Sequence, residues 1–212
     1  QYPSAEVFKK QADIFLAVKN ELSEYPIDLG WWIGVTFKSG PSPLFTGQVG
    51  PDGEIHPFAN CPLAPNFRKQ FIKNAALFAE IAKPSFILTE DDFTIRGANG
   101  CFCEEHLKEF AKKQGRYFSR AELVNALGRR TPDSIEIIKN RREVLKESLV
   151  GMAKALRKEI DIKSPEIPIG YNQPGGDDYD GAGAAEIARA LAGPRHTPFL
   201  RLYGSFYGGF KT

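Results

Sequence analysis

The sequence lacks an apolar run long enough to cross a bilayer, and it has no excess of charge of one sign. Its 212 residues carry a formal net charge of only +2, with acids and bases interspersed. A membrane span needs about 20 apolar residues, and nucleic-acid binding leaves a basic patch or stripe. We therefore expect neither a membrane nor a nucleic acid as partner. The first residues also lack a basic stretch followed by an apolar one, which favours a cytoplasmic location.

Cysteine is scarce as well, with three residues in the whole chain. An odd number cannot pair completely, and a single residue separates Cys101 from Cys103, so a disulfide framework is disfavoured. With Cys61 and His106 they form the pattern Cys-x39-Cys-x-Cys-x2-His. Three thiolates and one imidazole are the ligand set of a closed, structural zinc site. The alternative is three buried free cysteines beside a surface histidine.

The chain does contain an alternation of helical and extended segments. Apolar residues at helical spacing and capping residues predict helices at 4–24, 67–82, after Cys103, from Ser119, from Thr131 to about 160, and at 184–193. Short apolar segments bounded by turn residues predict strands at 29–37, 85–89, 167–173 and 198–204. The stretch 38–65 is rich in glycine and proline and is expected to be a long loop.

Alternating strands and helices predict an α/β fold with a parallel sheet. Four strands do not close a (β/α)8 barrel, which needs eight. We expect residues 1–212 to form one domain, an incomplete part of such a TIM-type barrel, with a zinc-stapled loop region at about 38–115. Two open sheet edges would then pair with the remainder of the barrel or with a second copy. The sequence also lacks an initial Met, which indicates a trimmed N-terminus; an open doubly wound sheet is the alternative.

Acidic side chains cluster just after two of the predicted strands. Glu90, Asp91 and Asp92 follow the second strand, and Asp177 and Asp178 follow the third. Active sites of β/α barrels lie at this edge of the sheet, and crowded carboxyls raise one another's pKa, as a general acid requires. Clustered carboxylates also suit Mg²⁺ or Mn²⁺. The simplest alternative is a set of solvated turn residues.

The segment "TEDDF" lies nine residues before "CFCEEHLKEF", with one cysteine about forty residues farther upstream. This arrangement resembles the acid/base and zinc region of family-42 glycoside hydrolases, the β-galactosidases. In that family an Asp-Asn-Glu stretch precedes a Cys-x-Cys-x-x-Cys cluster; here His106 replaces the third cysteine, and Glu90, Asp91 and Asp92 take the three acid/base positions. The resemblance covers roughly residues 29–115 and implies about strands three to six of a retaining glycosidase barrel.

The resemblance implies that Asp92 is the proton donor and that Glu90 and Asp91 support it; a register shift of two would make Glu90 the donor. The second catalytic carboxylate would lie outside this chain. Candidates for binding a carbohydrate substrate are Arg96, Tyr171, Asn172, Asp177, Asp178, Arg201 and Tyr203.

Three functions stay open at this stage. The first is a glycoside hydrolase acting on a β-galactoside or related β-glycoside. The others are a Mg²⁺- or Mn²⁺-dependent hydrolase and a noncatalytic carbohydrate-binding or assembly module. The sequence determines neither the sugar and its linkage nor a retaining or inverting outcome.

Overall fold

The structure is a computed structural model that describes residues 2–33, 37, 43–97, 99–129, 131–173 and 183–202. Its helices are α1 (Ala5–Glu21), α2 (Pro65–Ala82), α3 (Glu104–Gln114), α4 (Arg120–Gly128), α5 (Pro132–Ile160) and α6 (Ala184–Ala192). Its strands are β1 (Trp31–Trp32), β2 (Gly47–Val49), β3 (Ile55–Asn60), β4 (Ile87–Leu88), β5 (Ile169–Asn172) and β6 (Leu200–Arg201). None of the described helices combines the length and hydropathy needed to cross a bilayer.

The main sheet has the strand order β1-β4-β5-β6, and every pairing in it is parallel. The register places Trp31 beside Ile87 and Ile87 beside Ile169. Strands that are consecutive in the predicted order are thus neighbours in space, as in a β/α barrel. The predicted α/β fold with four parallel strands is confirmed, and β1 and β6 lie at the two edges of this sheet.

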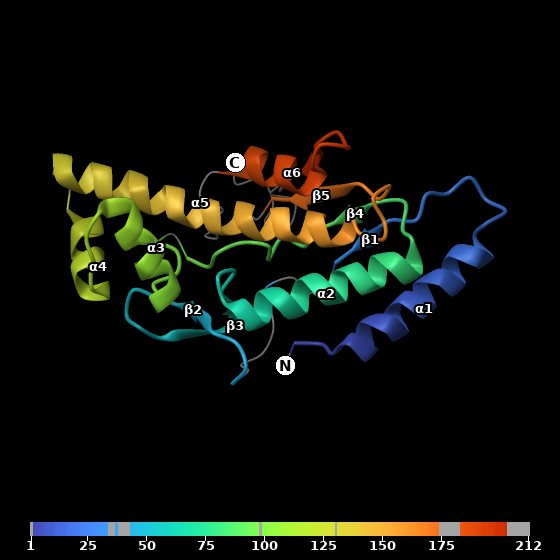
Figure 1. Cartoon of the computed structure of the whole chain (residues 1–212), viewed down its shortest axis with the longest axis horizontal. Helices are drawn as coiled ribbons and strands as arrows, with labels where there is room; N and C mark the ends of the chain where they lie inside the picture. Colours follow the sequence, from blue (N-terminus) through green and yellow to red (C-terminus); the bar gives the residue numbers. More distant parts are fainter. Residues whose placement is uncertain are drawn as a thin grey trace, which may run out of the picture.

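One face of the sheet is covered by helices that lie side by side (Figure 1): α2 contacts α1 and α5, and α6 contacts α5 and β5. Trp31 points to this face, where its ring stacks on Phe78 of α2 with centroids 3.7 Å apart. Trp32 points the opposite way because side chains alternate along a strand. The almost wholly apolar sequence of this strand predicts that both of its faces are covered, but Trp32 is 54% exposed since the described residues add no second layer there.

Large and small residues alternate across the face that carries Trp32. The ring of Phe86 lies over Gly30, where an added Cβ would be only 2.2 Å from the ring. The ring of Phe199 lies over Gly170 in the same way, and the two rings meet edge to face at 6.4 Å. Interiors of β/α barrels are filled by side-chain layers contributed by alternate strands. This face therefore has the character of one side of a barrel interior.

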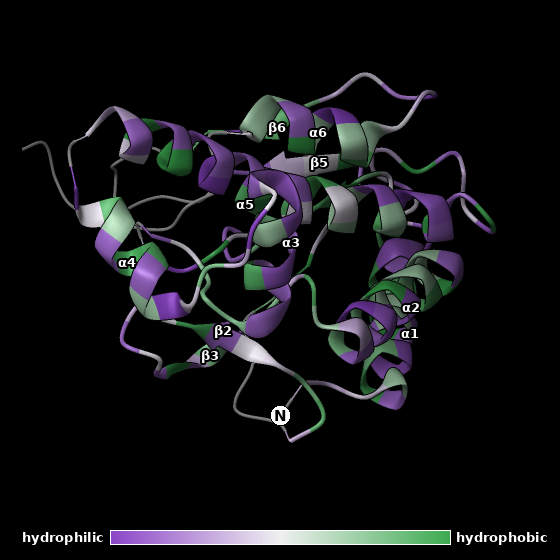
Figure 2. Cartoon of the chain, turned by 60° about the vertical axis from the view of Figure 1, so that its left-hand side comes forward, coloured by the Kyte–Doolittle hydropathy of each residue, from purple (hydrophilic) through white to green (hydrophobic). Residues whose placement is uncertain are grey.

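The segment predicted as a loop contains a β-hairpin, and that prediction was wrong for β2 and β3. The two strands pair antiparallel around a turn in which Gly53 has φ +95°, so the turn residues themselves were identified correctly. The hairpin lies beside α3 in both views (Figure 1 and Figure 2). Its strands escaped notice because they are short and Ile55 and Phe58 are exposed, so no alternation of apolar and polar residues marks them.

The predicted starts of two helices are confirmed, whereas the predicted buried side of the first helix was wrong. Ser119 and Glu122 form the expected capping box, and Thr131 caps α5 just before Pro132. The apolar spacing in α1 predicts a buried stripe that includes Val7, Ile14 and Val18, but these side chains are exposed and Phe8 is buried instead. Apolar spacing identifies a helix but cannot say which neighbours are present to cover it.

We predict that Phe71→Ala strongly destabilises the fold, because Phe71 of α2 is fully buried among aromatic rings, including Phe37 and Phe93. The loss should be about 3–5 kcal/mol in the free energy of unfolding, measured by urea denaturation. Ile135→Ala on α5 is the control: Ile135 is 66% exposed, and the change should stay within about 0.5 kcal/mol. Equal losses would contradict the packing described here.

Candidate functional site

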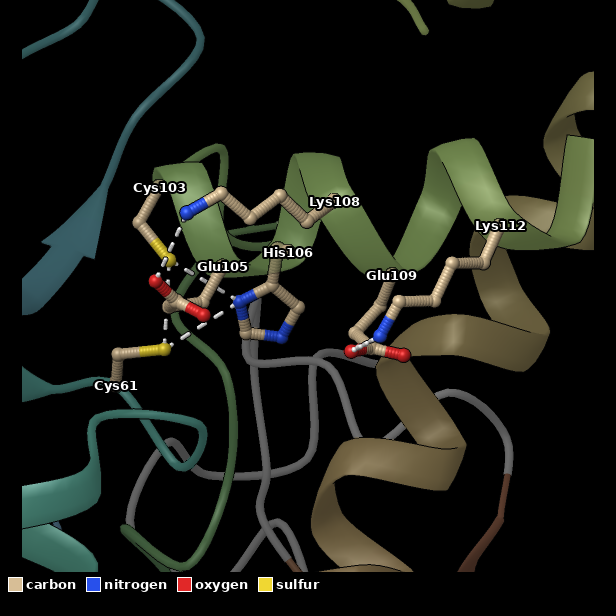
Figure 3. Close-up of polar contacts among 7 residues, drawn as sticks. All are labelled: Cys61, Cys103, Glu105, His106, Lys108, Glu109 and Lys112. Carbon is tan, nitrogen blue, oxygen red and sulfur yellow. Dashed lines mark hydrogen bonds and ion pairs between the residues drawn. The ribbon is translucent and has the colours of Figure 1, made fainter. Parts of the chain in front are cut away.

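The four residues of the predicted metal site converge in the structure. The ligand atoms of Cys61, Cys101, Cys103 and His106 all lie within 4.8 Å of one another, and all four side chains are buried. The Sγ atoms of Cys61 and Cys103 are 3.5 Å apart, and each lies 3.4 Å from Nδ1 of His106 (Figure 3). The site joins two segments that are far apart in sequence.

Local structure explains how the chain brings these atoms together. Cys61 follows β3 directly, whereas Cys103 is the N-cap residue of α3 and places His106 in the first turn of that helix. Gly100, with φ +70°, turns the chain into Cys101. A Cβ at Gly100 would lie 2.5 Å from Leu145, so glycine is also required there by space.

The second ring nitrogen of His106 is held by α5. Nε2 lies 3.3 Å from Oγ of Ser148, and that hydroxyl donates its proton to the carbonyl oxygen of Leu145 at 2.7 Å. Since the hydroxyl proton is already used, Nε2–H is the donor to Ser148. Nδ1 is then left as a lone pair facing the sulfurs, which is the tautomer a metal ligand needs.

Backbone N–H groups donate hydrogen bonds to two of the sulfurs, which stabilises negative charge on them. The amide of Val49 donates to Cys101 Sγ, and the amide of Leu63 donates to Cys61 Sγ, each at 3.4 Å. Burial raises the pKa of Cys61 well above its usual value, while the hydrogen bond with Cys101, followed by burial, raises that of Cys103 to about 12 against the opposing effect of Cys61. Burial also opposes ionisation of Cys101, yet hydrogen bonds with Cys103 and Cys61 lower its pKa. Three ionised thiols therefore need an added cation.

This geometry fits a tetrahedral zinc ion. With a Zn–S bond of about 2.3 Å, two sulfurs of a regular tetrahedron lie about 3.8 Å apart. The observed separation of 3.5 Å between Cys61 and Cys103 is close to that value. Four protein ligands leave no position for a substrate or a reactive water, which is typical of structural sites.

A second group of titratable side chains follows β4. Glu90 forms hydrogen bonds with Asp91 and Asp92, and its pKa is raised to about 8, first by burial and then by the charges of Asp92 and Asp91. Asp92 is almost fully buried, whereas Glu90 and Asp91 are half-buried. The cluster thus holds a proton on Glu90 at neutral pH.

Tyr2 adds a group to this cluster that the sequence did not suggest. Its ring is buried among Phe8, Phe45 and Phe67. Burial raises the pKa of its hydroxyl, and the charge of Asp92 raises it further. Tyr2 therefore stays neutral beside the carboxyl cluster.

The predicted substrate-binding residues are spread over several environments. Tyr171 is fully buried against Phe93, and Asn172 accepts a hydrogen bond from Arg201 Nη1 at 3.2 Å. Arg96 lines a cavity of about 670 Å³ between the β2–β3 hairpin and the loop at 96–100. Asp177, Asp178 and Tyr203 lie outside the described residues.

Two further residues beside the metal site were missed by sequence reasoning. Arg141 and Ser148 lie on the buried side of α5 together with Leu145 and Met152. Their spacing was the available signal, because polar residues within the apolar stripe of a helix need a buried partner.

The sequence matches no known family model and no curated protein. The fold, however, is similar to solved glycosidases. A β-galactosidase from Bacillus circulans sp. alkalophilus aligns with a TM-score of 0.50 and 20% identity, over 76% of this chain and 27% of that chain. A polyextremophilic β-galactosidase from the Antarctic haloarchaeon Halorubrum lacusprofundi aligns with a TM-score of 0.58 and 12% identity, over 81% of this chain and 30% of that chain.

At these identities the similarity shows the fold alone. The chain spans less than a third of either β-galactosidase, because the alignments cover 27% and 30% of their lengths. The resemblance to part of a β-galactosidase barrel, first indicated by the acidic and cysteine motifs, is confirmed at the level of the fold.

Proposed function

We propose that this chain is part of the catalytic barrel of a glycoside hydrolase, and that Glu90 is its proton donor toward a β-galactoside or related β-glycoside. One observation carries the proposal: three carboxyl groups meet directly after β4, and Glu90 retains a proton with a pKa of about 8. The carboxyl ends of the strands are where β/α barrels hold their active sites.

The environment of each acid suits a different role. Protonation of the glycosidic oxygen requires a carboxylic acid that is neutral at working pH and can reach the substrate. Glu90 meets both conditions better than Asp92, which is almost fully buried. Asp91 and Asp92 then act as the charges that keep the proton on Glu90. This assignment corresponds to the register shift of two considered for the motif.

The second catalytic carboxylate and the rest of the substrate site are assigned to further β/α units. Support comes from the edge strand β1, where Trp32 with Ile14 and Val18 of α1 lines an apolar groove of about 570 Å³. Further strands would cover this groove and complete the barrel. Pairing with a second copy is the alternative, and the oligomeric state decides between them.

The cysteine–histidine cluster is assigned to a structural Zn²⁺ that ties the hairpin to α3. When bound, the ion supplies the positive charge that three buried thiolates need. The alternative, a Mg²⁺- or Mn²⁺-dependent hydrolase, also relies on Asp177 and Asp178, which lie outside the described residues.

Zinc content tests the metal assignment. Protein purified without added metal should contain about one zinc per chain by elemental analysis, because four buried ligands form a closed site. His106→Gln and Cys103→Ser should each lower both the zinc content and the melting temperature. His196→Gln is the control, since His196 lies outside the cluster and contacts Pro165. Wild-type protein without bound metal would disprove the assignment.

The pH dependence of stability tests the proton on Glu90. Its pKa in the folded chain, about 8, lies above its ordinary value of 4.5. Folding therefore favours the protonated form, and this contribution is complete below about pH 4.5 and is lost as the pH rises through about 8. Glu90→Gln should remove this loss, so that its advantage over the wild type grows with pH in urea unfolding.

Glu122→Gln is the matched control for that measurement. The cap bonds from Ser119 lower the pKa of Glu122, so its contribution has the opposite sign and is present at higher pH. Glu122→Gln should give no gain in stability with rising pH. If Glu90→Gln behaves in the same way as Glu122→Gln, Glu90 is an ordinary ionised surface acid.

Catalysis is tested in the complete protein that contains this chain. Glu90→Gln should slow hydrolysis of glycosides with poor leaving groups by ~10²-fold or more, and activated aryl glycosides much less, because a good leaving group needs no proton. Asp92→Asn should keep more activity and shift the basic limb of the pH profile downward, since it removes a charge that raises the pKa of Glu90. If Asp92→Asn shows the selective loss, Asp92 is the donor. If neither change matters, the noncatalytic carbohydrate-binding role replaces this proposal.

A further inference from the structure

A buried arginine lies next to the cysteine–histidine cluster. Arg141 of α5 is only 2% exposed, and its guanidinium lies 4.8 Å from the ring centroid of Phe102. Its Nη2 donates to the carbonyl oxygen of Cys101. Its Nε and Nη1 are also buried, and they have no hydrogen-bond acceptor among the described residues. Such a cation is costly to bury unless an anion compensates it.

The carbonyl oxygen that Arg141 binds belongs to Cys101, one of the four residues of the cluster, so the cluster is the candidate source of that anion. No carboxylate in the described part of the chain forms an ion pair with Arg141.

A second buried arginine of the same helix shows how a buried guanidinium is usually compensated, by a carboxylate. Arg157 is also almost fully buried, but its guanidinium pairs with Asp161 at 2.8 Å and donates to the carbonyl oxygen of Ile167 at 2.7 Å. The contrast within α5 indicates that Arg141 is matched to a different kind of anion.

The charge of a loaded site identifies that anion. A divalent ion bound by three thiolates and one neutral imidazole has a net charge of −1, which is unfavourable in a buried position unless a cation stands beside it. We propose that Arg141 is the counter-cation of this metal centre, a positioning residue that makes a buried three-thiolate, one-imidazole site with a divalent ion electrically neutral. The inference rests on the proposed metal site and adds a determinant of its affinity and charge state.

This role has consequences for both the ligands and the fold. The Cys101 carbonyl lies next to a ligand sulfur, so its bond from Arg141 also holds the chain that carries that ligand. Ser148, which lies about two turns farther along the same side of α5, orients His106. One helix thus supplies both the charge and the orientation of the site, and a cation at position 141 favours three ionised sulfurs over a mixture of thiols and thiolates.

Metal affinity of three arginine variants tests the inference. Arg141→Met keeps the length of the side chain without its charge, and Arg141→Lys keeps the charge. Affinities for Zn²⁺ and Co²⁺ are measured by competition with a chelator on the full chain. Arg141→Met should lose about 10–100-fold in affinity, the usual scale for residues that support metal ligands, while Arg141→Lys should recover most of this loss. Arg157→Met is the control, because it removes a buried arginine far along the same helix and should leave the affinity unchanged.

A spectroscopic readout separates charge compensation from general damage. The sulfur-to-cobalt charge-transfer bands of the Co²⁺-loaded protein should shift in Arg141→Met and stay near the wild-type position in Arg141→Lys and Arg157→Met. Affinity and bands of Arg141→Met equal to those of the wild type would overturn the inference. Equal losses of metal affinity in Arg141→Met and Arg157→Met would also overturn it. A further variant, Arg141→Gln, guards against misfolding: if neither Arg141→Met nor Arg141→Gln folds even with excess zinc, Arg141 supports the fold and not the metal, and the inference is wrong. Wild-type protein that binds neither ion would instead disprove the metal site itself.

Discussion

The convergence of Cys61, Cys101, Cys103 and His106 is the constraint on which the rest of the candidate site depends. The hairpin of β2 and β3 is short and carries exposed side chains, so it has little packing of its own. It is attached to the body by hydrogen bonds to Phe37, Thr94 and Phe102, and by the ligand set itself. The loop that carries Arg96 is held by this hairpin, because Gln48 accepts a hydrogen bond from the Arg96 amide and donates one to the carbonyl oxygen of Thr94.

Burial of charge explains both candidate centres. In a medium of low dielectric constant an isolated charge is costly, and the chain meets this cost in two ways. In the acidic cluster a proton on Glu90 removes one of the negative charges, at a pKa of about 8. In the cysteine–histidine cluster Arg141 instead binds the backbone of Cys101, and three ionised sulfurs require a metal ion as well. One environment keeps a proton available, whereas the other is suited to a permanently bound cation.

The parallel sheet sets where these centres lie. β4 is central in the sheet and ends at the acidic residues, so the carboxyl groups lie at the edge where barrel active sites are found. The face of the sheet that the helices do not cover carries Trp32 and the Phe86–Gly30 contact. Large and small side chains alternate there, as in the interior of a barrel. The similarity to part of two β-galactosidase structures agrees with this arrangement.

Local patterns in the sequence were enough to determine the parallel α/β fold, the helix starts at Ser119 and Thr131, and the four members of the cysteine–histidine cluster. Each of these depends on spacing or on short-range capping, which a single chain segment carries by itself. Tertiary structure alone decided the hairpin, the exposure of Trp32 and Ile135, and the different environments of Glu90 and Asp92. It also placed Arg141 and Ser148 beside the cluster. These features depend on neighbours brought from distant parts of the chain, and burial by such neighbours is what shifts a pKa or makes a charge need a partner.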